Sequence, residues 1–139
     1  MNIDSIKNGV VIDHITAGKA MQLYNMLGLD TLDCSVAVIK NVPSQKMGKK
    51  DIIKIDASLD LDFDVVGFIS PKATINIIEN SKLIKKNYVD MPKRLVNIIK
   101  CKNPRCITTT EQDIEHIFVI SNKNNTEYRC LYCEAKAQI

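Results

Sequence analysis

The sequence contains no tryptophan, and aromatic residues make up only 5% of its 139 residues. Proteins that bind single-stranded nucleic acid stack bases on aromatic side chains, so this scarcity argues against that class. No apolar run approaches the ~20 residues that span a membrane. Residues 1–9 also lack an apolar stretch after a basic start, so we expect no secretory signal. These absences indicate a cytoplasmic protein in a reducing compartment, where disulfides are rare.

The overall composition is that of an ordinary globular protein. Hydrophobic residues make up 45% and charged residues 25% of the chain, whose length suits one domain or two small ones. The net charge of +3 is too small to indicate a nucleic-acid partner by itself. Basic residues concentrate in the stretch 85–105, against a single acidic one, Asp90. We interpret this stretch as a solvated connector, with a phosphate-binding stripe as the alternative.

Four of the five cysteines form two close pairs near the C-terminus. Four residues separate Cys101 from Cys106, and two residues separate Cys130 from Cys133. The two thiolates of each pair can reach the same ion, and four thiolates complete the closed tetrahedral shell of a structural zinc site. The spacing therefore predicts one structural Zn²⁺ ion per chain without a catalytic role. Two disulfides or an iron–sulfur cluster are the alternatives.

Three further residues invite a chemical interpretation. Cys34 lies in an apolar segment that we expect to be a strand, so it is predicted to be a small buried hydrophobe. Asp13 and His14 are neighbours on another expected strand, where consecutive side chains point to opposite faces and need not touch. No obvious nucleophile lies nearby in the sequence. A ligand-binding or packed histidine is therefore favoured over a catalytic one.

The pattern of hydrophobic residues predicts a split β-α-β-β-α-β arrangement. Strands are expected at 10–15, 34–39, 51–55, 74–78 and 82–85, and helices at 17–27 and 61–69. Thr16 is the expected N-cap of the first helix, and Gly28 the glycine that ends it. This order is typical of the ferredoxin-like α+β fold, an antiparallel sheet with helices on one face. A set of basic residues is compatible either with ordinary surface lysines or with a phosphate site: Lys46, Lys49, Lys50, Lys54 and Lys86.

The chain is expected to form two domains, 1–92 and 99–139, joined by a linker at 93–98. Pro92 marks the boundary because it cannot donate a ladder hydrogen bond, and a short helix is expected after it. Strands at 117–120 and 127–130, with a turn at 122–125, predict a hairpin in the second domain. A domain of about 40 residues usually needs a metal, disulfides or a partner to fold.

Four blocks of the sequence, taken in order, carry a resemblance to a known family. They are residues 9–15, 43–55, 71–76, and the two cysteine pairs with Glu134 after the last cysteine. Over nearly all of its length the chain resembles the regulatory chain of aspartate carbamoyltransferase, an enzyme of early pyrimidine biosynthesis. The resemblance implies a chain that is not itself an enzyme. It also implies an N-terminal allosteric domain that binds nucleotides such as ATP and CTP, and a C-terminal zinc domain that docks on catalytic chains.

The resemblance further implies which residues act. Those implied to bind the nucleotide are Ile3, Asp4, Ile6, Asp13, His14, Ile52, Lys54, Asn76, Ile78, Leu83 and Lys86. Within this set, Lys54 and Lys86 would hold phosphates. The positions implied at the interface with the catalytic chain are Asn103, Arg105 and Glu134. Regulatory chains of this family pair as dimers through the N-terminal domain, so a second copy is an expected partner.

The alternative function is that of a zinc-ribbon protein that binds nucleic acid through residues 85–105. A pull-down experiment distinguishes the two. The family resemblance predicts capture of a catalytic carbamoyltransferase chain, whereas the alternative predicts capture of nucleic acid that salt releases.

Overall fold

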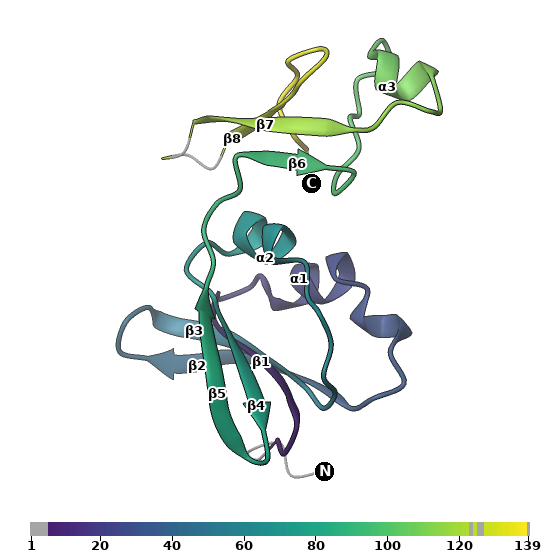
Figure 1. The fold of residues 1–139 in the computed structure, drawn as a ribbon. Helices are drawn as coiled ribbons and strands as arrows, with labels where there is room; N and C mark the ends of the chain where they lie inside the picture. The colour runs from purple at the N-terminus through teal and green to yellow at the C-terminus, as the bar shows by residue number, and fades with distance from the viewer. Residues whose placement is uncertain (1–5, 123, 125–126, 139) are drawn as a thin grey trace. The chain divides into compact units, whose positions relative to one another are not determined.

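The computed structural model describes residues 6–122, 124 and 127–138, and the chain divides into two compact units, Met1–Asp90 and Met91–Ile139. The first unit contains β1 (Gly9–Thr16), α1 (Ala20–Met26), a 3-10 turn (Leu29–Thr31), β2 (Val36–Ser44), β3 (Gly48–Ile55), α2 (Phe63–Ile69), β4 (Thr74–Glu79) and β5 (Lys82–Tyr88). Its five strands form one antiparallel sheet in the order β2-β3-β1-β4-β5 (Figure 1). The predicted α+β fold is therefore confirmed, with β5 as the fifth strand.

Alternation along the strands sorts the side chains of this sheet onto two faces. Ile12 on β1, Ile53 and Ile55 on β3, and Ile75 on β4 are all buried. Both helices lie on one side of the sheet in Figure 1, and they contribute buried residues such as Leu23 to the core. The residues between the buried ones point to the opposite face. That open face is where polar side chains of several strands meet.

Strand β1 contains a β-bulge that changes how Asp13 and His14 lie. The register with β3 shifts between Ile12 and Ile15, and His14 has a positive φ of 57°. The backbone N–H of His14 donates a hydrogen bond to Asp13 Oδ1 at 2.6 Å. Simple alternation, on which the sequence interpretation of this pair depended, therefore does not apply here, because a bulge adds one residue to the strand.

The start of α1 differs from the prediction. The helix begins at Ala20 with Lys19 as its N-cap, whereas Thr16 is the last residue of β1. The expected capping role of Thr16 is wrong because the carboxylate of Asp51, on β3, accepts hydrogen bonds from the backbone N–H groups of Gly18 and Ala20. A side chain distant in sequence thus satisfies amides at the start of the helix.

Two other local features test the sequence interpretation. Gly28 follows the C-cap of α1 with a φ of 68°, so the prediction of a left-handed glycine at this end is confirmed. Cys34 is only half-buried and lies before β2, so its expected place in a strand interior is wrong. Among the described residues, no helix is long and apolar enough to cross a membrane.

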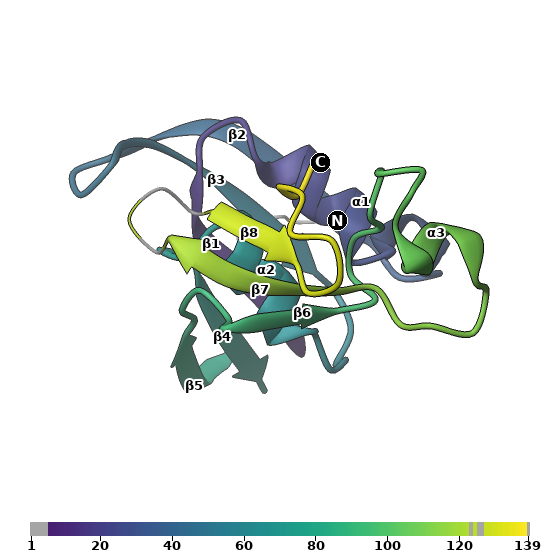
Figure 2. The same ribbon diagram turned by 90° about the horizontal axis from the view of Figure 1, so that it is seen from above.

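The second unit is a small antiparallel sheet with one short helix. It contains β6 (Arg94–Val96), α3 (Ile107–Thr110), β7 (Ile117–Asn122) and β8 (Glu127–Cys130), with the strands in the order β6-β7-β8 (Figure 2). The helix expected after Pro92 is wrong, because Leu95 pairs with Phe118 of β7 and makes this segment a strand. Leu95, Phe118 and Tyr128 form the small buried core.

Candidate functional sites

The four paired cysteines converge on one point of the second unit. Their Sγ atoms all lie within 4.8 Å of one another, with 3.6 Å between Cys101 and Cys133 and 3.7 Å between Cys106 and Cys130. All four thiols are free. Metal–sulfur bonds of about 2.3 Å in a tetrahedron place the sulfurs about 3.8 Å apart. The geometry therefore fits one tetrahedral ion, and the separations are too long for disulfide bonds of about 2.05 Å.

The secondary structure holds these ligands in place. Cys101 and Cys106 lie at the two ends of a short loop, and Cys106 is also the N-cap residue of α3. Cys130 is the last residue of β8, and Cys133 lies in the turn that follows. Three of the thiols are buried and that of Cys133 is half-buried. A closed shell of four thiolates around one ion would leave no position for a substrate.

The electrostatics of the cluster also favour a cation. Burial and the hydrogen bonds of the neighbouring thiols together raise the pKa of Cys101 to about 12, against the N–H group of Asn103, which lowers it. Burial acts in the same direction at Cys133, but the N–H group of Ala135 and the side chain of Asn103 lower its pKa to about 7. Four thiols this close cannot all ionise without a compensating positive charge. A bound divalent ion would supply that charge and deprotonate its ligands.

The three residues implied at a partner interface surround this centre. Arg105 and Glu134 are exposed, and Asn103 is half-buried. Asn103 Oδ1 accepts a hydrogen bond from the N–H of Arg105, and its backbone carbonyl accepts one from the N–H of Cys106. Glu134 has a positive φ of 64°, and its N–H donates to the carbonyl of Cys130. All three therefore lie close to the candidate metal ligands in the chain, on backbone held by hydrogen bonds to Asn103 and Cys130.

A second candidate site lies on the open face of the sheet in the first unit. Val11 of β1 lies directly opposite Lys54 of β3 on one side and Asn76 of β4 on the other, and Asn76 lies opposite Lys86 of β5. Residues paired in this way share one face of a sheet and touch across the strands. The register thus sets a continuous row of side chains from β3 to β5.

This row borders a hollow of about 400 Å³. Of the residues implied to bind the nucleotide, it is lined by Ile6, Asp13, Ile52, Lys54, Asn76, Ile78, Leu83 and Lys86. Ile3 and Asp4 lie outside the described residues. Val11 also lines the hollow, and the sequence interpretation missed it. Its position two residues before Asp13, on the same face of β1, was the signal available.

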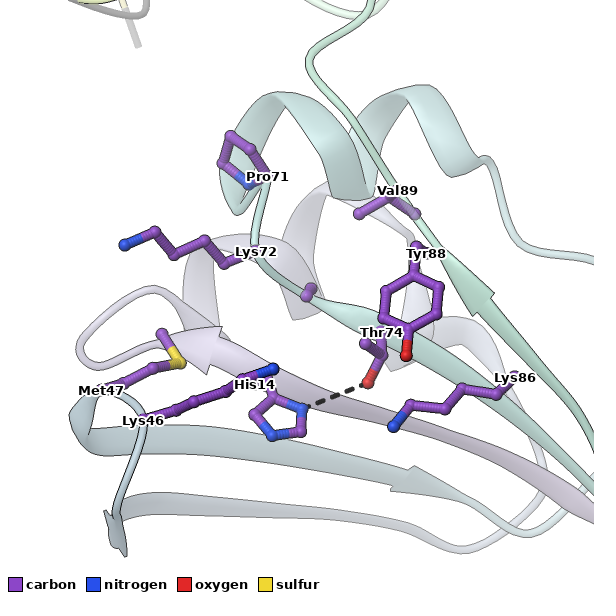
Figure 3. Close-up of a pocket in the computed structure, with 10 residues that line it drawn as sticks. His14, Lys46, Met47, Pro71, Lys72, Thr74, Lys86, Tyr88 and Val89 are labelled. Carbon is purple, nitrogen blue, oxygen red and sulfur yellow. Dashed lines mark hydrogen bonds between the residues drawn. The ribbon is translucent and has the colours of Figure 1, made fainter.

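His14 lies in an adjoining hollow of about 360 Å³ (Figure 3). Its Nδ1 atom lies 3.3 Å from Thr74 Oγ1, the contact dashed in the figure. Lys46 and Lys86 also line this hollow, and in this view their amino groups approach the imidazole from either side. Lys86 lines both hollows, and its amino group lies 5.6 Å from the centre of the Tyr88 ring. The bulge in β1 therefore separates His14 from the hollow that Asp13 lines.

Charges around the two hollows are predominantly positive. Burial acts to raise the pKa of Asp13, but two hydrogen bonds hold that pKa below its usual value. One comes from Lys50, whose Nζ lies 2.9 Å from Oδ1, and the other from the backbone N–H of His14. Burial lowers the pKa of His14. The negative charge of Asp13 opposes this effect, whereas the positive charges of Lys50, Lys86 and Lys46 lower the pKa further. An ionised aspartate and a neutral histidine therefore stand among lysines, an environment that suits an anion.

The side-chain oxygen of Asn76 is unusual because, among the described residues, it lacks a hydrogen-bond partner. This Oδ1 atom is also buried. Buried polar atoms in proteins are nearly always paired, so an orphaned acceptor that lines a hollow calls for an explanation. A donor on a bound molecule would provide one.

Comparison with known proteins shows the family. Residues 1–90 match the family described as aspartate carbamoyltransferase regulatory chain, allosteric domain, and residues 93–139 match its metal binding domain. The aspartate carbamoyltransferase regulatory chain of Clostridium botulinum (strain Hall) is 49% identical over 134 residues, which cover 96% of this chain and 92% of that relative. The one from Clostridium tetani is 49% identical over 135 residues, covering 96% and 94%. The one from Bifidobacterium longum is 38% identical over 139 residues, the full length of both. The chain therefore belongs to the family of regulatory, not catalytic, chains of aspartate carbamoyltransferase.

Proposed function

We propose that the first unit binds a nucleoside triphosphate effector, ATP or CTP, in the hollow on the open face of its sheet. The observation that carries this proposal is the combination of Lys54, Lys86 and the unpaired Oδ1 of Asn76 in one hollow. The lysines would hold phosphate oxygens by charge-assisted hydrogen bonds. Asn76 would accept a hydrogen bond from a ribose hydroxyl or a base amino group. Apolar neighbours such as Val11 and Ile52 would pack against the base.

Replacing Lys54 by alanine should weaken ATP or CTP binding about 10- to 100-fold. A hydrogen bond to a charged group contributes ~1.5–3 kcal/mol, and about 1.4 kcal/mol corresponds to a tenfold change in affinity. Calorimetric titration of the full chain provides the measurement. Lys40→Ala is the matched control, because Lys40 is an exposed lysine of the same sheet that does not line the hollow. Equal affinities for the two variants would remove Lys54 from the site, and no binding to the wild-type chain or its holoenzyme would refute the proposed effector site.

The proposed role of the nucleotide is to shift a conformational equilibrium rather than to react. An effector changes the balance between two states of the holoenzyme only by its differential affinity for them. Substrates bound to the catalytic chains must then alter nucleotide affinity by the same factor. A second copy of this chain would pair with the first unit, whose edge strands β2 and β5 offer unpaired backbone groups. We expect this assembly in the cytoplasm.

We further propose that the second unit binds zinc and docks on a catalytic chain. Four thiolates in a closed shell favour zinc over harder ions. Exposed apolar residues directly follow two of the ligands in the sequence: Ile107 at the start of α3, and Leu131 and Tyr132 in the turn after β8. Apolar side chains on rigid backbone, with Asn103, Arg105 and Glu134 nearby, match the composition of a protein–protein interface.

Replacing Glu134 by alanine should weaken association with catalytic chains about tenfold or more without releasing the metal. Loss of one partner of a buried interfacial charge pair typically costs at least that much. Asn103 is a less clean test, because its side chain also hydrogen-bonds to Cys133. Sedimentation of the chain mixed with catalytic trimers measures assembly, and metal analysis of the same sample measures retention. Glu111→Ala, at another exposed carboxylate of this unit, is the control. Undiminished assembly of the Glu134 variant would move the interface elsewhere.

A further inference from the structure

A buried hydroxyl lies next to one of the metal ligands. Thr108 Oγ1 is 3.1 Å from Cys106 Sγ, and the Thr108 residue is only 4% exposed. Thr108 lies on the first turn of α3, and Cys106 is the N-cap residue of the same helix. The first turn of the helix therefore places the Thr108 hydroxyl next to the Cys106 sulfur. No substrate or partner role explains a threonine buried at this point.

Each of the other three sulfurs receives at least one hydrogen bond from a backbone N–H group, and Cys133 receives another from the side chain of Asn103. The N–H of Asn103 donates to Cys101, that of Tyr132 to Cys130, and that of Ala135 to Cys133. Backbone donors are present whatever the side chain is. Cys106 Sγ contacts a side-chain hydroxyl, that of Thr108, in addition to the sulfurs of the other three cysteines. This hydrogen bond at Cys106 therefore depends on the identity of residue 108.

We propose that the Thr108 hydroxyl donates a hydrogen bond to the Cys106 thiolate and thereby slows release of the bound metal. This inference rests on the metal binding proposed above. A free thiol can donate or accept, but a ligating thiolate carries no proton, so the hydroxyl must be the donor. Donation to the sulfur stabilises its negative charge and fixes its orientation toward the ion. Thr108 is a positioning residue in this role, because it acts on the metal only through Cys106.

The neighbouring threonines show that this contact is specific. Thr109 Oγ1 donates to the backbone carbonyls of Cys106, at 2.7 Å, and Asn103, at 2.9 Å. Thr110 is exposed, and its hydroxyl donates to the carbonyl of Ile107 within the same helix at 3.3 Å. Of these three consecutive hydroxyls in the described part of the chain, that of Thr108 is the one that contacts a ligand sulfur. Thr110 therefore provides a matched control for the loss of a threonine hydroxyl.

The test compares pairs of variants that differ only in the hydroxyl. Wild type and Thr108→Val form one pair of similar shape, and Thr108→Ser and Thr108→Ala form a second pair for use if valine prevents folding. The full chain is loaded with Zn²⁺, and the rate of release to a chelator is measured. A lost outer contact typically weakens metal binding 10- to 100-fold, so release should be about 10- to 100-fold faster without the hydroxyl. Thr110→Val should release metal at the wild-type rate.

A spectrum of the Co²⁺-loaded chain separates charge stabilisation from packing. Removing the hydrogen bond leaves the Cys106 sulfur richer in electrons, so the thiolate-to-cobalt charge-transfer band should move to lower energy in the valine and alanine variants. The serine variant should keep the wild-type band. Equal release rates and bands within both pairs would overturn the role of Thr108. Faster release from serine and alanine alike would assign the effect to packing and also overturn it. A wild-type chain that binds no metal would refute the zinc proposal itself.

Discussion

Removal of the metal should unfold the second unit and leave the sheet of the first unit intact. The core of Met91–Ile139 contains few large buried side chains, among them Leu95, Phe118 and Tyr128. A structural zinc site contributes on the order of 10–16 kcal/mol, whereas whole domains are typically stable by only about 5–15 kcal/mol. Without the ion, the hydrophobic burial that remains is too small to fold a unit of this size. Hydrogen exchange resolved by peptide should show protection lost in β7 and β8 and retained in β1 and β3.

Single substitutions separate the metal ligands from the remaining cysteine. Cys106→Ser removes one ligand and should cause the same loss of hydrogen-exchange protection in the second unit as removal of the metal. Cys34→Ser should leave the metal content and the exchange pattern unchanged, because Cys34 belongs to the other unit. A second unit that stays protected after complete metal removal would show that its apolar core suffices. The structural role assigned to the four thiolates would then be incorrect.

Replacing Asp51 by alanine should destabilise the first unit by about 3–5 kcal/mol. This carboxylate is fully buried and accepts three hydrogen bonds from backbone N–H groups. Oδ2 lies 3.0 Å from the nitrogen of Gly18 and 3.2 Å from that of Ala20, and Oδ1 lies 2.9 Å from that of Asn41. Alanine would leave these buried donors without an acceptor, at about 1–3 kcal/mol for each donor that water cannot reach. Such a loss belongs to the upper end of single-residue effects.

Asp51 joins the turn before α1 to a bulge in β2, where Asn41 has a positive φ of 60°. Denaturant unfolding monitored by hydrogen exchange in β1 and β3 measures the loss of stability. Asp60→Ala, at an exposed aspartate of the same unit, should change the free energy of unfolding by no more than about 0.5 kcal/mol. Similar free energies of unfolding for the two variants would show that water can replace the three hydrogen bonds of the Asp51 carboxylate without loss of stability.

Two errors of the sequence interpretation, the helix after Pro92 and the N-cap at Thr16, share one cause. The segment after Pro92 forms a strand because β7 pairs with it, and the turn before α1 is organised by Asp51 from β3. Both outcomes depend on residues that are distant in the sequence. Periodicity and capping preferences describe only local tendencies, which tertiary contacts override. The expectations that held, such as the left-handed Gly28 at the end of α1, depend on local backbone geometry.

The amino-acid sequence by itself determined the order of the strands and helices in the first unit. It also determined the ligands of the candidate metal centre, because the cysteines of each pair are close along the chain. Only the tertiary structure decided which side chains share the hollow on the open face. Lys54, Asn76 and Lys86 come from three strands, and their alignment depends on the register of β1 with its neighbours. The bulge that moves His14 into the adjoining hollow is likewise set by pairing with β3. The alternation of side chains along a strand predicts which face of the sheet each residue lies on. The pairing with neighbouring strands sets the register and the positions of bulges.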